Sequence, residues 1–120
     1  PKIYPFVIEN KFEDVDKTAQ VKKILENIDL KDEMRRDAKK KVRAGKGKTR
    51  GRMYRKKKGP LLIVSKECKL EKAVKNIPGI DVCIVNNLNA EILAPGADVG
   101  RIAIWTEGAI EKLSEGKLFK

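Results

Sequence analysis

The stretch LLIVSKECKLEKAVKNIPGIDVCIV, residues 61–85, decides the fold. It begins with LLIV (61–64) and ends with VCIV (82–85), two short runs that are apolar on both faces, as strands inside a parallel sheet are. A strand, a helix and a second strand in this order form the unit from which parallel sheets are built. The helix between them is predicted from apolar residues at the spacing i, i+3, i+4, i+7, namely Leu70, Ala73, Val74 and Ile77.

The alternation of strands and helices continues on both sides of this stretch. Residues 4–8 (YPFVI) favour a buried strand, and residues 101–105 (RIAIW) favour another. Asp16, Asn89 and Thr106 are each placed to cap a helix that follows. The pattern therefore predicts an α/β fold of the three-layer Rossmann-like kind, with a mostly parallel sheet covered by helices on its faces.

The charge of the chain is concentrated in one segment. At 120 residues the chain has the length of one domain with a real core, so we expect a single α/β domain over residues 1–120. Residues 39–58 contain 12 basic side chains and no acidic one. The other 100 residues contain 16 basic and 17 acidic side chains, so the whole net charge of +11 comes from this segment.

Residues 39–59, which we call the basic arm, have the composition of an RNA-binding segment. Residues 31–41 favour a helix with little apolar surface, whereas residues 44–59 show no hydrophobic period and predict an extended or irregular loop that packing within the chain does not hold. So many cations repel one another unless a polyanion neutralises them. Arginines bind phosphates with two hydrogen bonds, and a tyrosine offers an aromatic face to an unstacked base. The predicted RNA-binding residues are Lys39, Lys40, Lys41, Arg43, Lys46, Lys48, Arg50, Arg52, Tyr54, Arg55, Lys56, Lys57 and Lys58.

Two other interpretations of the basic arm are open. A run of charge is often a solvated loop, although the internal position of this run and its mixture of Arg, Gly and Tyr favour nucleic acid. Gly47-Lys48-Thr49 resembles the end of a phosphate-binding P-loop. That motif needs a glycine five residues before Gly47, where this sequence has Val42, and it needs a strand just upstream.

The sequence offers little to a catalytic mechanism. It contains no histidine, the commonest general base. Cys68 and Cys83 have no close pair spacing and are interpreted as small, reduced, buried side chains. Asn86, Asn87 and Asn89 follow a predicted strand end, where open α/β sheets place ligands, but hydrogen bonds within a tight turn are favoured over direct RNA contact.

We therefore expect no enzymatic activity, no cofactor, no metal and no small-molecule substrate. The longest apolar run, residues 60–64, is far shorter than the ~20 residues that cross a bilayer, so we also expect a soluble intracellular protein without a membrane partner. The rival hypothesis is a Rossmann-like enzyme that acts on a nucleotide or on RNA. A sequence-specific DNA regulator ranks below it, because no predicted helix carries the side chains of a recognition helix.

Four motifs in order resemble one family. They are VRAGKGKTRGRMYRKKKGPLLIV from Val42, NIPGIDVCIVNNLN from Asn76, LAPG from Leu93 and GRIAIWTEGAI from Gly100. Together they are similar to the universal L-four family of large-subunit ribosomal proteins, in its archaeal and eukaryotic form and over its carboxy-terminal portion. The resemblance extends from about Tyr4 to the end of the chain.

The resemblance implies a structural constituent of the large ribosomal subunit in the cytoplasm. Such a protein binds large-subunit rRNA, helps to assemble it and meets neighbouring ribosomal proteins, and residues 43–58 fall in the basic family segment that faces rRNA. The family also carries an amino-terminal portion with a loop that reaches the polypeptide exit tunnel, so no residue here is assigned to the tunnel. We expect that portion to supply at least one strand of the sheet. We further expect the near-neutral body to dock on folded rRNA while the basic arm threads between RNA segments.

Overall fold

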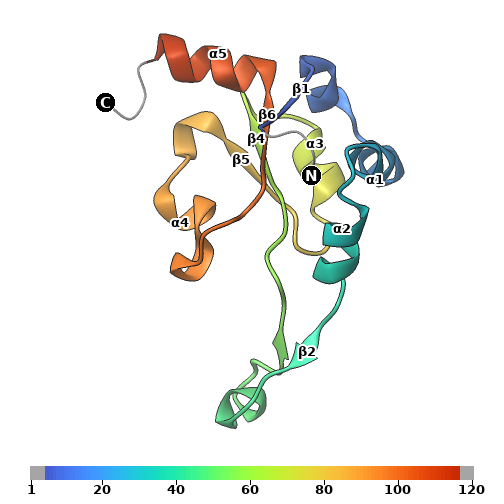
Figure 1. Cartoon of the computed structure of the whole chain (residues 1–120), viewed down its shortest axis with the longest axis vertical. Coiled ribbons are helices and arrows are strands. Elements are labelled where there is room, and N and C mark those ends of the chain that lie inside the picture. The colour runs from blue at the N-terminus through green and yellow to red at the C-terminus, as the bar shows by residue number, and fades with distance from the viewer. Residues whose placement is uncertain (1–4, 117–120) are drawn as a thin grey trace.

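A parallel sheet of four strands forms the centre of the computed structural model, which describes residues 5–116 (Figure 1). The strands lie in the order β1-β6-β4-β5, and each neighbouring pair is parallel. This sheet confirms the prediction of an α/β fold with a mostly parallel sheet. The strands are β1 (Phe6–Ile8), β4 (Leu61–Val64), β5 (Asp81–Ile84) and β6 (Ala103–Thr106).

Two hydrophobic cores cover the two faces of the sheet. Leu62 and Val64 of β4 belong to one core, and Leu61 and Ile63 belong to the other, as the two-residue period of a strand requires. All residues of β4 are buried, so the prediction of a central strand at 61–64 is confirmed. The first core is closed by the 3-10 helix η1 (Asn10–Asp14), α1 (Thr18–Asn27) and α3 (Leu70–Val74), and the second by α4 (Ala90–Leu93) and α5 (Glu107–Glu115).

The first predicted strand differs from the observed one. We expect a buried strand over residues 4–8, but β1 lies at the edge of the sheet and Val7 leaves 49% of its surface exposed. The apolar run predicts the strand but not its place at the edge of the sheet, where the Val7 side chain remains half exposed. Tyr4 lies outside the described residues.

One predicted helix cap is wrong because the helix begins later than expected. We expect Asp16 to cap the first helix, but α1 begins at Thr18, Lys17 takes the N-cap position, and no side chain caps it. The Thr18 hydroxyl instead donates a 2.9 Å hydrogen bond to the carbonyl oxygen of Ala73, which ties α1 to α3.

Of the other two predicted caps, one is confirmed and one is wrong. The Asn89 side chain accepts a 2.9 Å hydrogen bond from the backbone N–H of Ile92 and caps α4 as predicted. Thr106 does stand at the N-cap of α5, but its side chain does not cap the helix. Its hydroxyl instead donates a 2.7 Å hydrogen bond to Glu13 and so joins the end of β6 to η1.

The basic arm projects from the body as a short antiparallel ribbon (Figure 1). The helix that we expect over residues 31–41 is shorter, since α2 (Lys31–Asp37) ends before the arm. In place of a wholly irregular loop, β2 (Lys41–Val42) pairs with β3 (Tyr54–Arg55), and the 3-10 helix η2 (Lys46–Thr49) forms the tip. The radius of gyration is 15.4 Å, against about 13.6 Å for a compact domain of this length, because the arm extends away from the core.

Candidate nucleic-acid interface

Local backbone contacts hold the two sides of the basic arm together. The Arg43 N–H donates to the carbonyl oxygen of Met53 at 2.8 Å, and the Arg43 Nε donates to the carbonyl oxygen of Arg52 at 3.1 Å. Gly45 and Gly51 flank the tip with φ values of 81° and 76°, a conformation that side chains disfavour. The glycines that the sequence places among the cations therefore allow the chain to turn.

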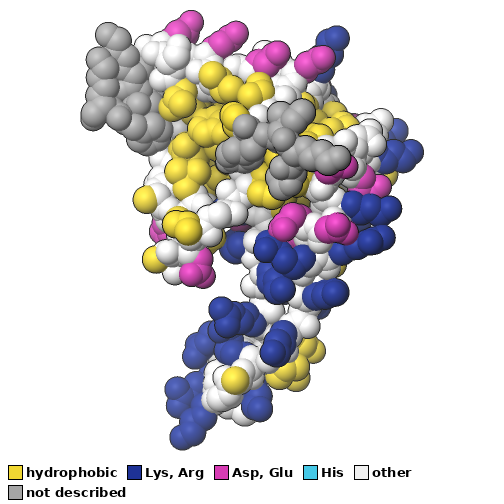
Figure 2. All heavy atoms as spheres, in the orientation of Figure 1, with side chains coloured by type: hydrophobic (Ala, Val, Ile, Leu, Met, Phe, Trp, Pro, Cys, Tyr) yellow, Lys and Arg dark blue, Asp and Glu magenta, His cyan; other side chains and the backbone are white. Residues whose placement is uncertain are grey.

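The cations of the basic arm are exposed and largely free of carboxylate partners. Of its 12 basic residues, Arg43 is half-buried and the others are exposed. Within residues 5–116, Lys58 is the one arm cation that forms an ion pair, 3.0 Å from Asp81. Figure 2 shows dark-blue side chains gathered on the outer part of the arm, where no acidic side chain is seen in this view. Their charge is available to an external polyanion.

The structure distributes the predicted site residues over three parts of the arm. The ribbon carries Tyr54, whose side chain is 46% exposed and whose ring lies 5.3 Å from the Lys40 ammonium, a cation–π contact. The first side of the ribbon holds Lys39, Lys40, Lys41 and Arg43, the tip holds Lys46, Lys48, Arg50 and Arg52, and the returning side holds Tyr54, Arg55, Lys56, Lys57 and Lys58.

A buried carboxylate lies at the root of the basic arm, where it joins the body. Asp37 is 3% exposed and packs against Gly59 and Gly79, which are joined by a 2.7 Å backbone hydrogen bond. Arg36 donates to Asp37 Oδ1 at 3.3 Å and to the carbonyl oxygen of Lys58 at 3.2 Å. Within the described chain Asp37 Oδ2 has no partner, and burial raises the pKa of this carboxyl above its usual value.

Arg101 is a structural residue at the root that the sequence interpretation missed. Its side chain is 5% exposed and donates to the carbonyl oxygens of Gly59 and Ile92, both at 2.8 Å, and to Asp81 Oδ2 at 2.6 Å. Burial opposes ionisation of Asp81, but the hydrogen bonds from Arg101 and Lys58 outweigh it and hold the pKa of this carboxyl below its usual value. The sequence does hold one sign of this role, because Arg101 stands at the start of an apolar run. An arginine that is buried with such a run needs hydrogen-bond acceptors.

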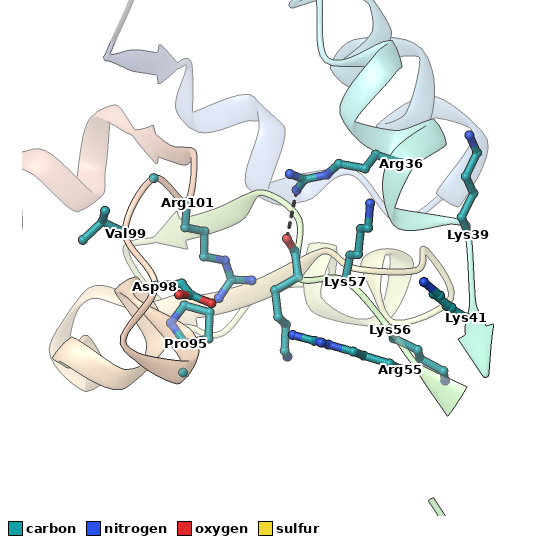
Figure 3. A pocket seen from close by; sticks show the side chains of 13 residues that line it. Arg36, Lys39, Lys41, Arg55, Lys56, Lys57, Pro95, Asp98, Val99 and Arg101 are labelled. Atoms are coloured by element: carbon teal, nitrogen blue, oxygen red, sulfur yellow. Dashed lines mark hydrogen bonds between the residues drawn. The ribbon is translucent and has the colours of Figure 1, made fainter. Parts of the chain in front are cut away.

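A cleft of about 660 Å³ lies between the basic arm and the loop that follows α4. Figure 3 shows Lys41, Arg55, Lys56 and Lys57 on the arm side, with Pro95, Asp98 and Arg101 across from them. The lining residues are Arg36, Lys39, Lys41, Arg55, Lys56, Lys57, Lys58, Pro95, Gly96, Asp98, Val99, Gly100 and Arg101.

Comparison with known proteins identifies the family of this chain. A family model described as "Ribosomal protein L4/L1 family" matches residues 5–116. The chain belongs to this family. The large ribosomal subunit protein uL4 of Methanosphaera stadtmanae is 44% identical over 117 residues, which make up 97% of this chain and 44% of that protein.

Further relatives agree with this assignment. The proteins of the same name from Archaeoglobus fulgidus and Tetrahymena thermophila are each 45% identical over 92% of this chain, and the matches cover 44% and 28% of those proteins. This member of the L4/L1 family therefore spans less than half the length of the curated relatives described here. The resemblance that the four sequence motifs indicate is confirmed.

In this L4/L1 family member, the carboxyl ends of β4 and β6 are occupied by the protein itself. Glu13 is 4% exposed and accepts hydrogen bonds from the Ser65 N–H and hydroxyl, each at 2.9 Å, and from the Thr106 hydroxyl. These bonds outweigh burial and lower the pKa of Glu13. The Asn10 side chain accepts a 2.7 Å hydrogen bond from the Gly108 N–H at the start of α5. At β4 and β6, the edge of the sheet where open α/β folds place ligands is thus covered by η1.

The remaining candidate residues take structural or exposed positions. Asn86 and Asn87 are exposed, and no hydrogen bond of their side chains is found among the described residues, so of the three asparagines Asn89 alone takes the expected turn role there. Cys68 and Cys83 are free thiols whose pKa values are raised by burial. In the part of the chain that is described, no group of three or more potential ligands gathers around a metal position, and no helix has the length and apolarity to cross a membrane.

Proposed function

We propose that this chain is a structural part of the large ribosomal subunit that binds large-subunit rRNA through its basic arm and helps the rRNA to fold. The observation that carries the proposal is the separation of charge: an arm whose exposed cations mostly lack carboxylate partners, on a body with almost no net charge. The names of the relatives support a place in the large subunit. We also propose that the protein lies in the cytoplasm and contacts neighbouring ribosomal proteins.

The basic arm acts by screening phosphates. When a lysine or arginine meets a phosphate, a condensed counterion is released, and the logarithm of the affinity falls with the logarithm of the salt concentration by about 0.7–0.9 per contact. The cations of the tip lie at the end of a two-stranded ribbon that projects from the body, so they are open to RNA (Figure 1). Screening by such a ribbon lets RNA segments pack more closely than their own charge permits.

The ribbon also supplies a surface for unpaired bases. Tyr54 presents an exposed ring beside Lys40, and stacking of a base on an aromatic ring contributes about 1–3 kcal/mol. This contribution does not depend on salt, so it adds to the electrostatic affinity without changing the salt slope. In a salt titration of RNA binding, replacement of Tyr54 should therefore lower the affinity without changing the slope, whereas replacement of the tip cations should change the slope.

The proposal is tested by removing charge from the tip and, as a matched control, from the body. The tip variant carries alanine at Lys46, Lys48, Arg50 and Arg52. The control variant carries alanine at the exposed body lysines Lys22, Lys23, Lys69 and Lys72, which make no ion pair within the described chain.

Affinity for a large-subunit rRNA transcript is measured over a range of salt concentrations. We expect the slope of the tip variant to be shallower by about 3, since four contacts of about 0.7–0.9 each are lost. The control should change it by less than about 1. Circular dichroism should show that both variants remain folded, because all eight side chains lie on the surface. Equal slopes for the two variants would show that the basic arm is not the RNA contact.

A further inference from the structure

The cleft at the root of the basic arm has two walls of different chemistry. Among its lining cations, Arg36, Lys58 and Arg101 are already paired with carboxylates of the protein. The cations that make no ion pair within residues 5–116 all come from the arm, and they are Lys39, Lys41, Arg55, Lys56 and Lys57.

The opposite wall belongs to the body. It is formed by the loop from Pro95 to Arg101, and its one acidic side chain is the exposed Asp98. Figure 3 shows Asp98 beside Pro95 and Arg101 on the side of the cleft that faces the arm strand. The cleft therefore has a cationic arm wall and a body wall with a hydrogen-bond acceptor.

Hydrogen bonds from Arg101 and Arg36 join the root of the basic arm to the body. Arg101 joins the arm root at Gly59 to α4 at Ile92 and to the start of β5 at Asp81. Arg36 holds the carbonyl oxygen of Lys58 from the other side. Because these contacts do not involve the five unpaired arm cations, the cleft is formed before any ligand enters it.

We infer that this cleft holds a short segment of a single RNA strand, with its phosphates against the arm wall and its riboses or bases against Asp98. The inference rests on the proposed function and adds a contact that the body makes. The volume of the cleft lies within the range of roughly 300–1,000 Å³ that is usual for ligand sites, which suits part of one strand better than a double helix. A carboxylate repels phosphates but accepts hydrogen bonds from a 2′-hydroxyl or an exocyclic amine, and this difference sets the orientation of the strand.

The test changes charge on the body wall and leaves the basic arm intact. Asp98 has an ordinary backbone conformation, with φ −85° and ψ 126°, so Asp98→Lys is tolerated by the backbone. Its matched control is Glu111→Lys, which makes the same change of charge on an exposed residue of α5, the helix at the far end of the body from the arm (Figure 1). Asp98→Asn removes the charge but keeps an acceptor.

The binding of all three variants is measured with fluorescein-labelled oligouridylate of about 12 nucleotides and with an RNA duplex of the same length, at about 0.1 M salt. Asp98→Asn keeps an acceptor for the 2′-hydroxyl but no longer repels phosphates, so we expect it to raise the affinity for the single strand about two- to threefold. Asp98→Lys loses that acceptor but brings a cation close to two or three phosphates, so we expect a net gain in affinity of about five- to tenfold. Glu111→Lys should raise it less than about twofold, because screening removes most of the effect at that distance.

Failure of the inference and failure of the proposed function give different results. If Asp98→Lys and Glu111→Lys raise single-strand affinity equally, or if Asp98→Lys favours the duplex, the cleft does not hold a single strand. The tip variant would still weaken rRNA binding in that case. If the tip variant itself binds rRNA like the unaltered protein, the proposed function is wrong, and the inference about the cleft, which rests on it, is no longer supported.

Discussion

The packing at the root of the basic arm makes one prediction that can be worked out in detail, for the substitution Gly59→Ala. A Cβ at Gly59 would overlap Asp37 Oδ2, lie 2.7 Å from Asp37 Cγ and lie 3.2 Å from the carbonyl oxygen of Gly79. Asp37 is buried, so its carboxylate has to move against close-packed neighbours and loses its contact with Arg36. Overpacking of this kind costs about 1–3 kcal/mol, and the overlap places Gly59→Ala near 3 kcal/mol of lost stability.

The cause of this loss can be isolated with a double-mutant cycle. Asp37→Ala removes the two atoms that the new Cβ meets most closely, and the remaining 3.2 Å contact with Gly79 needs a shift of a few tenths of an ångström. In the Asp37→Ala background, Gly59→Ala should therefore cost less than about 1 kcal/mol, which gives a coupling free energy of about 2 kcal/mol. Urea unfolding followed by the fluorescence of Trp105, the one tryptophan of the chain, measures all four proteins.

Gly79→Ala is the matched control for this cycle. Its added Cβ would lie 2.6 Å from Asp37 Cβ, an atom that Asp37→Ala retains, and Gly79 has a φ of 83° that disfavours any side chain. Asp37→Ala should consequently fail to rescue Gly79→Ala. If Gly59→Ala costs the same in both backgrounds, or if both glycine substitutions are rescued alike, the packing of Asp37 does not limit the root and the reasoning is refuted.

Three further substitutions should reveal the roles of the buried charges. The pKa of Glu13 is lowered, so its carboxylate stabilises the fold at pH values above its ordinary pKa of 4.5. Glu13→Gln should therefore lower the free energy of unfolding by about 2 kcal/mol at pH 7. This loss should shrink as the pH falls through the pKa of Glu13 in the folded protein. The pKa of Asp37 is raised, so its ionisation lowers stability as the pH rises above its ordinary pKa of 3.8. Asp37→Asn should therefore raise the free energy of unfolding by about 1 kcal/mol at pH 7 and leave it unchanged at pH 3. A difference between the two proteins that stays constant across this pH range would contradict the assignment. Arg101→Ala should cost about 2–3 kcal/mol by urea unfolding, because it removes the Arg101 donor from the carbonyl oxygens of Gly59 and Ile92 and leaves Asp81 with Lys58 alone. A loss below about 0.5 kcal/mol would show that Arg101 is not structural.

The elements that the sequence predicts well are those whose cause lies within a few residues. The run at 61–64 is apolar at every position, and a strand buried on both faces is what such a run requires. Asn89 caps α4 through a bond to Ile92, three residues away, so its role is visible in the sequence. The position of the basic arm follows in the same way from local charge and from the absence of a hydrophobic period.

The predictions that fail depend on partners far along the chain. The hydroxyl of Thr106 is placed for a helix cap, but Glu13, 93 residues away, accepts its hydrogen bond. Arg101 draws its acceptors from positions 42, 9 and 20 residues away, and no local pattern identifies such a set. The ribbon of the arm was missed because each of its strands has only two residues, too few for the two-residue period to be recognised.

The paired charges at the root explain how a strongly basic arm can be joined to a near-neutral body. Lys58 is the last cation of the arm, and Asp81 accepts from both Lys58 and Arg101 at the place where the chain enters the sheet. The carboxylate thus neutralises positive charge where water is partly excluded and repulsion would be strongest. Farther out, where solvent and salt screen the cations, carboxylate partners would only compete with RNA for them. If this division is right, Asp81→Asn should lower stability through its effect on Arg101. A new carboxylate at the exposed tip, such as Lys48→Glu, should instead weaken RNA binding and leave stability unchanged.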